Sequence, residues 1–104
     1  MKFKINELNN IAIGLQALSV VKMKGSIKFK IVRDLREVDE ILSDALKANN
    51  NNPEMSKDIA DKVVNVDLEE IYENELEDLE ITPAVIYQLG GLLRQQEITG
   101  VEYD

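Results

Sequence analysis

The first half of the chain combines a short alternating stretch with two helical patterns. Residues 2–5 alternate charged and apolar side chains, which is typical of a short strand. Apolar residues then recur at steps of three and four, which predicts an amphipathic helix with a face of Leu8, Ile11, Leu15 and Leu18. After an interruption at "KMKGS", a longer stripe with similar steps predicts a second helix. That stripe consists of Ile27, Ile31, Leu35, Val38, Leu42 and Ala45.

The second half of the chain is less regular. An asparagine run before Pro53 predicts a loop over residues 49–56. Residues 63–69 alternate apolar and polar side chains, which predicts a half-buried strand. We expect this strand to pair with residues 2–5, its acids opposite the lysines. Thr82 followed by Pro83 predicts the start of a C-terminal helix, and residues 97–104 predict either an edge strand or a frayed end.

Together these elements predict an α+β fold that is mainly helical. It contains an αα-hairpin, a small two-stranded β element and a C-terminal helix. The length of 104 residues fits a single domain. Within it we expect a strand plus helical hairpin over 1–48, the asparagine-rich loop over 49–56, and an acidic strand with the C-terminal helix over 57–104.

Composition argues against several function classes. The chain has no cysteine and no histidine, so it lacks thiol nucleophiles, zinc–thiolate sites and the commonest general base near neutral pH. We therefore expect no enzyme activity, no catalytic residues, no metal and no cofactor. The net charge of −8 argues against general nucleic-acid binding and against anionic membranes. No apolar run is long enough to span a bilayer and no signal peptide is visible, so we expect a cytoplasmic protein.

The charge is divided between the two parts of the chain. Residues 1–36 hold eight basic and two acidic side chains, whereas residues 37–104 hold four basic and eighteen acidic ones. Such an asymmetry needs a physical explanation. The simplest one is that the acidic part packs against the basic part, either within one chain or across a dimer.

Residues 66–80 form an acidic segment with eight carboxylates in fifteen positions. Paired carboxylates can perform acid–base chemistry or bind Mg²⁺ or Ca²⁺. An EF-hand loop requires a glycine, however, and none lies between Gly25 and Gly90. We prefer the interpretation of a solvated strand edge, with an acidic interaction surface as the alternative. The candidates for that surface are Asp67, Glu69, Glu70, Glu73, Glu75, Glu77 and Asp78.

Two further candidate sites lie around the start of the second helix. Basic side chains near a helix start can hold an anion, and the candidates are Lys24, Ser26, Lys28 and Arg33. Here too we prefer a solvated face that pairs with the acidic part of the chain. The aliphatic stripe is expected to be mostly core. Part of it is a candidate oligomer seam, formed by Ile31, Leu35, Val38 and Leu42.

Two patches of the sequence resemble small uncharacterised proteins of phages and prophages of Gram-positive bacteria. "KFKINELNNIAIGLQALSVVKMKGSIKFKIVRDLREVDEIL" is similar to their opening, with a short strand, an EELN-like helix start and a second long helix. "LEDLEITPAVIYQL" is similar to their closing LEISP-like element and short helix. The chain departs from that pattern in its short middle and in "GGLLRQQEITGVEYD". The resemblance implies a phage or prophage origin and action inside a bacterial cell, and it carries over no catalytic residues.

The leading functional hypothesis is a non-enzymatic phage or prophage accessory protein. It would bind a host or phage macromolecule, with a protein as the expected partner, and form a homodimer or higher oligomer. One alternative is a counter-defence protein that sequesters an anionic nucleotide at the candidate anion site. Another is a minor component of virion assembly or a chaperone.

Overall fold

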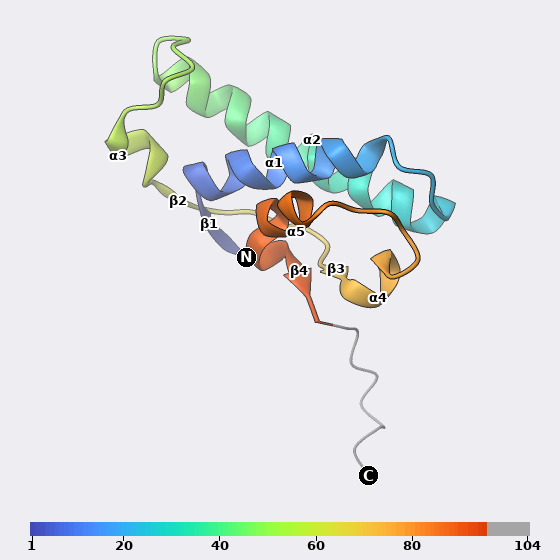
Figure 1. The fold of residues 1–104 in the computed structure, drawn as a ribbon. Helices are drawn as coiled ribbons and strands as arrows, with labels where there is room; N and C mark the ends of the chain where they lie inside the picture. Colours follow the sequence, from blue (N-terminus) through green and yellow to red (C-terminus); the bar gives the residue numbers. More distant parts are fainter. Residues whose placement is uncertain (96–104) are drawn as a thin grey trace.

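The computed structural model describes residues 1–95, which form a mainly helical α+β fold with small two-stranded sheets (Figure 1). The predicted fold class, including the helical hairpin, is confirmed. Residues 97–104, for which we predict an edge strand or a frayed end, lie outside the described residues. In chain order the elements are β1 (Lys2–Lys4), α1 (Ile5–Ser19), α2 (Gly25–Ala48), α3 (Lys57–Ala60), β2 (Val63–Asn65), β3 (Ile71–Tyr72), α4 (Glu73–Leu76), α5 (Pro83–Leu89), the 3₁₀ turn η1 (Gly90–Leu92) and β4 (Leu93–Arg94).

Helix α1 is the central element, and both α2 and α5 pack against it (Figure 1). Its predicted apolar face is confirmed, since Leu8, Ile11, Leu15 and Leu18 are all buried. Complete burial of a side chain of this size stabilises a fold by about 1.5–3 kcal/mol relative to its exposed form. The helix therefore supplies a large part of the hydrophobic core.

Helix α2 directs its aliphatic stripe inward, as the spacing predicts. Ile31, Val38 and Ala45 are buried, and Leu35 and Leu42 are partly buried against the core. Ile31 and Val38 have no exposed surface in the single chain. These two members of the candidate oligomer seam are therefore already used in the intramolecular core, and only Leu35 and Leu42 keep some surface.

The N-terminal strand β1 pairs with β2 in an antiparallel sheet, which confirms the predicted partners. Lys2 lies opposite Asn65 and Lys4 lies opposite Val63. The expectation that these lysines lie opposite acidic residues is therefore wrong. The paired strand ends at Asn65, before the acidic segment begins, although the alternating burial continues through Val66 and Leu68.

The asparagine run forms the connection after α2, and its backbone conformation there suits asparagine. Asn50 and Asn51 both adopt positive φ, at 57° and 59°, in the left-handed region that asparagine tolerates better than most residues. The Asn49 side chain donates to the carbonyl oxygens of Asn52 and Glu54, at 2.8 Å each. Side-chain hydrogen bonds thus shape the predicted loop before α3.

The sequence pattern does not predict β3, β4 or α4. Strands β3 and β4 are parallel, with Ile71 opposite Leu93 and Tyr72 opposite Arg94. These strands are two residues long, so they carry no recognisable period. The α5 start at Pro83 agrees with the prediction, and Gly90 follows the helix with a φ of 52°.

We predict that Gly14→Val lowers the free energy of unfolding by about 2–3 kcal/mol, because α5 comes very close to α1 at this glycine. A Cβ at Gly14 would lie 3.1 Å from Leu89 Cδ2 and 3.2 Å from Gln88 Cβ. A valine would therefore force α5 away from α1. Urea unfolding followed by circular dichroism measures the change.

Gly25→Ala is the matched control for this test. No heavy atom lies within 4 Å of a Cβ built at Gly25. The free energy of unfolding of this variant is therefore expected to lie within about 0.5 kcal/mol of the wild-type value. Equal stability of Gly14→Val and the wild type would contradict the close packing of α5 on α1.

Candidate functional site

The acidic segment is attached to α2 by polar contacts within one chain. The Glu69 amide donates to Asp34 Oδ1 at 2.8 Å, and Arg33 Nη2 lies 3.2 Å from Glu69 Oε2. Lys30 Nζ lies 2.8 Å from Glu75 Oε1. The basic and acidic parts of the sequence therefore contact each other within one chain. This is the simplest of the explanations given above for the charge asymmetry.

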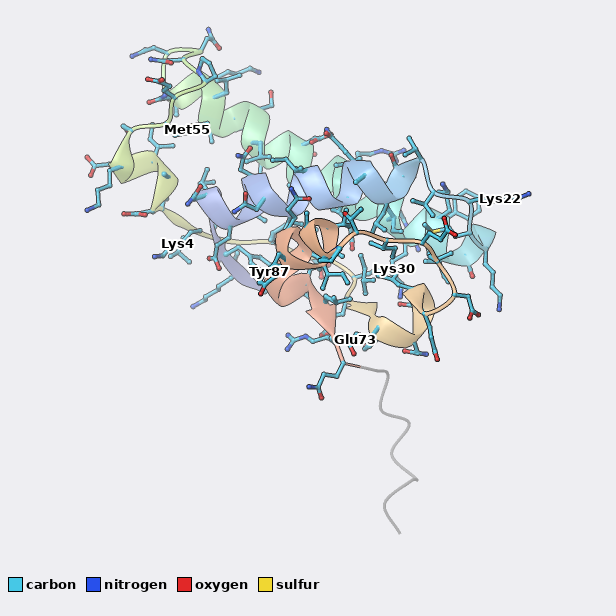
Figure 2. The ribbon with its side chains drawn as sticks, viewed as in Figure 1. Lys4, Lys22, Lys30, Met55, Glu73 and Tyr87 are labelled. Atoms are coloured by element: carbon cyan, nitrogen blue, oxygen red, sulfur yellow. The ribbon has the colours of Figure 1, made fainter. Side chains whose placement is uncertain are left out.

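Lys30 is the most enclosed of these basic contacts. Its ammonium group donates to both carboxylate oxygens of Glu75 and, at 3.1 Å, to the carbonyl oxygen of Glu70. It also lies 5.3 Å from the centroid of the Tyr72 ring, within the range of a cation–π contact. Figure 2 shows Lys30 beside α4. Since Glu75 Oε1 also accepts the Tyr72 amide at 2.9 Å, Lys30 and Glu75 position the start of α4.

The structure does not gather the four candidate anion-binding residues into one site. Lys28 Nζ donates to the carbonyl oxygens of Ser19 and Val21, at 2.6 Å each, and so satisfies the C-terminal end of α1. Arg33 extends to the acidic segment instead. Lys24 and Ser26 are exposed, and Ser26 lies inside the first turn of α2, which begins at Gly25.

The seven acidic candidates separate into two groups. Glu69, Glu70 and Glu75 form ion pairs with Arg33, Arg94 and Lys30. The remaining four are exposed, and within residues 1–95 they take part in no ion pair. These four are Asp67, Glu73, Glu77 and Asp78. Three of the seven thus have a structural role, and four remain available for a partner.

Glu73 and Glu77 border an apolar depression of about 280 Å³, which we call the α4–α5 groove. Its apolar lining comes from α4, the segment before α5, α5 itself and β4. Ile86 is 47% exposed and therefore presents apolar surface at the groove. The apolar lining residues are Leu76, Leu79, Ile81, Ile86 and Leu93.

Asp34 is the residue that the sequence reasoning missed. Its side chain is on the inward face of α2 and only 2% exposed. Oδ1 accepts the Glu69 amide, whereas Oδ2 has no hydrogen-bond partner within the described residues. The signal was present in the sequence, because Asp34 lies three residues after Ile31 and four before Val38, on the buried stripe.

The pKa of the Asp34 carboxyl is raised from 3.8 to about 6, chiefly by burial and to a smaller extent by the nearby Glu69 charge. The Glu69 amide and the charges of Lys30 and Arg33 act in the opposite direction. Asp34 lines a second depression, of about 380 Å³, together with Arg33, Arg36, Glu37, Asp67 and Glu69. A carboxyl with this pKa can exchange a proton near neutral pH, but the residues that line the depression supply no hydroxyl, thiol or imidazole beside it.

Comparison with protein-family models, with curated proteins and with solved structures gave no match. Within residues 1–95, no cluster of three or more acidic side chains is arranged to hold a metal ion. Each helix in the same range is too short or too polar to cross a membrane.

We predict that Asp34→Asn stabilises the protein at neutral pH by roughly 1–3 kcal/mol. The folded state raises the pKa of Asp34, so it binds a proton more tightly than the unfolded chain does. The stability contributed by that proton is fully present below about pH 4 and is lost as the pH rises through about 6. Asparagine removes the charge and keeps an oxygen that accepts the Glu69 amide.

The measurement is urea unfolding of both proteins across this pH range. The difference between their free energies of unfolding is expected to grow as the pH rises from about 4 to 7. Asp67→Asn, an exposed change at the same depression, serves as the control with no such trend. If Asp34→Asn is less stable than the wild type at neutral pH, the ionised carboxylate is a net stabilising anchor.

We also predict that Lys28→Met lowers the free energy of unfolding by about 1–2 kcal/mol. The change removes both charged hydrogen bonds to the end of α1 but retains a similar apolar chain. The exposed Lys24→Met is the control and is expected to change stability by less than about 0.5 kcal/mol. Thermal unfolding compares the two, and equal effects would mean that Lys28 has no special structural role.

Proposed function

We propose that this protein is a non-enzymatic accessory protein of a phage or prophage that binds another protein through the α4–α5 groove. The observation that supports this proposal is the combination of an apolar lining with two exposed carboxylates, Glu73 and Glu77, at its border. Exposed apolar surface bordered by polar residues is a common mark of a protein interaction site. The resemblance of the two sequence patches supports the phage origin.

The chemistry of the groove specifies the kind of partner. Its volume of about 280 Å³ accommodates a few apolar side chains. The acidic border favours lysine or arginine next to those side chains, because opposite charges at the rim of an interface increase the association rate and select the partner. A short amphipathic helix with apolar and basic residues meets both requirements.

The nucleotide-sequestering alternative has less support. Lys28 is held by the carbonyl oxygens of Ser19, at the end of α1, and of Val21, just after it, and Arg33 is paired with Glu69. An anion would have to compete with these contacts, whereas the border of the α4–α5 groove has no such internal partner within the described residues.

A labelled model peptide tests the proposed function. The probe is an amphipathic helical peptide with a leucine face and flanking lysines, and the comparison peptide replaces each lysine with glutamate. Fluorescence anisotropy is expected to show binding of the lysine peptide only. Glu73→Lys combined with Glu77→Lys is expected to weaken that binding by about tenfold or more, since both border charges are reversed.

A control variant carries the same change in charge at a distant place. Glu54→Lys combined with Asp58→Lys alters two exposed acids near α3, at the opposite end of the molecule from α4 (Figure 1). Its affinity for the lysine peptide is expected to stay close to that of the wild type. Equal weakening by both double variants would show a general charge effect, and no binding by the wild type would overturn the proposal.

A further inference from the structure

We propose that the partner of the α4–α5 groove is a second copy of this chain, which inserts the outer face of the first half of α2. This inference rests on the proposed function and names the occupant of the same site. We call the inserted surface the α2 outer face, and it consists of Phe29, Val32, Arg33 and Arg36.

The α2 outer face combines exposed apolar and basic side chains. Phe29 is 69% exposed and Val32 is 36% exposed, although both are large apolar residues. Positions 29, 32, 33 and 36 lie three, four and seven residues apart, so they share one side of the helix. Ile31 and Val38 occupy the other side and are buried. The face therefore points away from the core.

The α2 outer face and the α4–α5 groove are complementary in chemistry. An aromatic ring such as Phe29 offers a large apolar surface to bury in the apolar groove. Arg33 and Arg36 are opposite in charge to Glu73 and Glu77, which border the groove. The existing Arg33–Glu69 pair is a weak obstacle, because both side chains are at least half exposed.

The positions of the two surfaces require a contact between different molecules. Helix α2 packs on α1 through its inner side. None of the four residues of the α2 outer face lines the α4–α5 groove of the same chain. A second molecule is therefore needed to bring an α2 outer face into the groove. Association through two different surfaces is heterologous, and it produces rings or open chains of molecules.

Two single variants and their mixture test this arrangement. Phe29→Glu disables the α2 outer face and keeps the groove, whereas Ile86→Glu disables the groove and keeps the face. Light scattering across micromolar to near-millimolar wild-type protein is expected to show a mass that rises with concentration and falls with added salt. Each variant alone is expected to be a monomer. An equimolar mixture is expected to form dimers and nothing larger, since only one functional pair of surfaces remains.

Matched controls change exposed apolar residues that belong to neither surface. Val20→Glu and Tyr87→Glu change side chains that are 84% and 87% exposed, and Tyr87 lines a different depression from the α4–α5 groove. Both controls are expected to associate like the wild type. Circular dichroism of all four variants checks that each one is folded.

Several outcomes would overturn the proposal. They are a wild type that stays monomeric at every concentration, a Phe29→Glu or Ile86→Glu protein that still associates, and a mixture that stays monomeric. If the lysine peptide binds the groove in any of these cases, the proposed function stands and only the identity of the partner is wrong. If the peptide fails to bind as well, both are wrong.

Discussion

The burial of α1 between α2 and α5 is the interaction on which the other elements depend. Helix α1 has buried residues along most of its length, and both α2 and α5 pack against it (Figure 1). Gly14 makes the second contact close, since a side chain there would meet Leu89 and Gln88. A glycine inside a helix lowers its intrinsic stability by about 1 kcal/mol relative to alanine, which the packing of α5 offsets. The absence of a side chain at Gly14 thus allows α5 to pack closely on α1. This packing helps to position one wall of the α4–α5 groove.

Polar contacts from α2 position the other wall of the α4–α5 groove, the one that includes α4. The extended chain at residues 66–70 has little regular hydrogen bonding of its own, so Asp34 and Arg33 hold Glu69 while Lys30 holds Glu75 at the start of α4. A buried carboxylate carries a desolvation cost, which is why the pKa of Asp34 is raised to about 6. Raised pKa values often mark catalytic groups. Here the same carboxyl accepts a backbone amide and is surrounded by structural ion pairs, which explains the shift without catalysis.

The parts of this fold that local rules control were predictable from the sequence. The steps of three and four in α1 and α2 and the Thr82–Pro83 start of α5 report local geometry. The pairing of β3 with β4 was not predictable, because Ile71 and Leu93 are distant in the chain and each strand has two residues. The role of Lys28 was also hidden, since a basic residue on a helix has the same pattern whether it faces solvent or the end of α1. Among the acidic candidates, the sequence could not distinguish the paired carboxylates Glu69, Glu70 and Glu75 from the four others.

These contacts explain part of the division of charge along the chain. Within residues 1–95, three ion pairs neutralise Glu69, Glu70 and Glu75, which are the acids nearest the structural anchors. Carboxylates left over after internal pairing gain most from a basic partner, because exposed like charges repel each other and gain nothing from one another. Arg36, on the α2 outer face, and Glu73, at the groove, lie on surfaces that also expose large apolar side chains. Small ions from solution can neutralise charge alone, whereas apolar surface beside that charge leaves contact with water only when another apolar group covers it. That combination, rather than the acidity of the chain, is the argument for a protein partner.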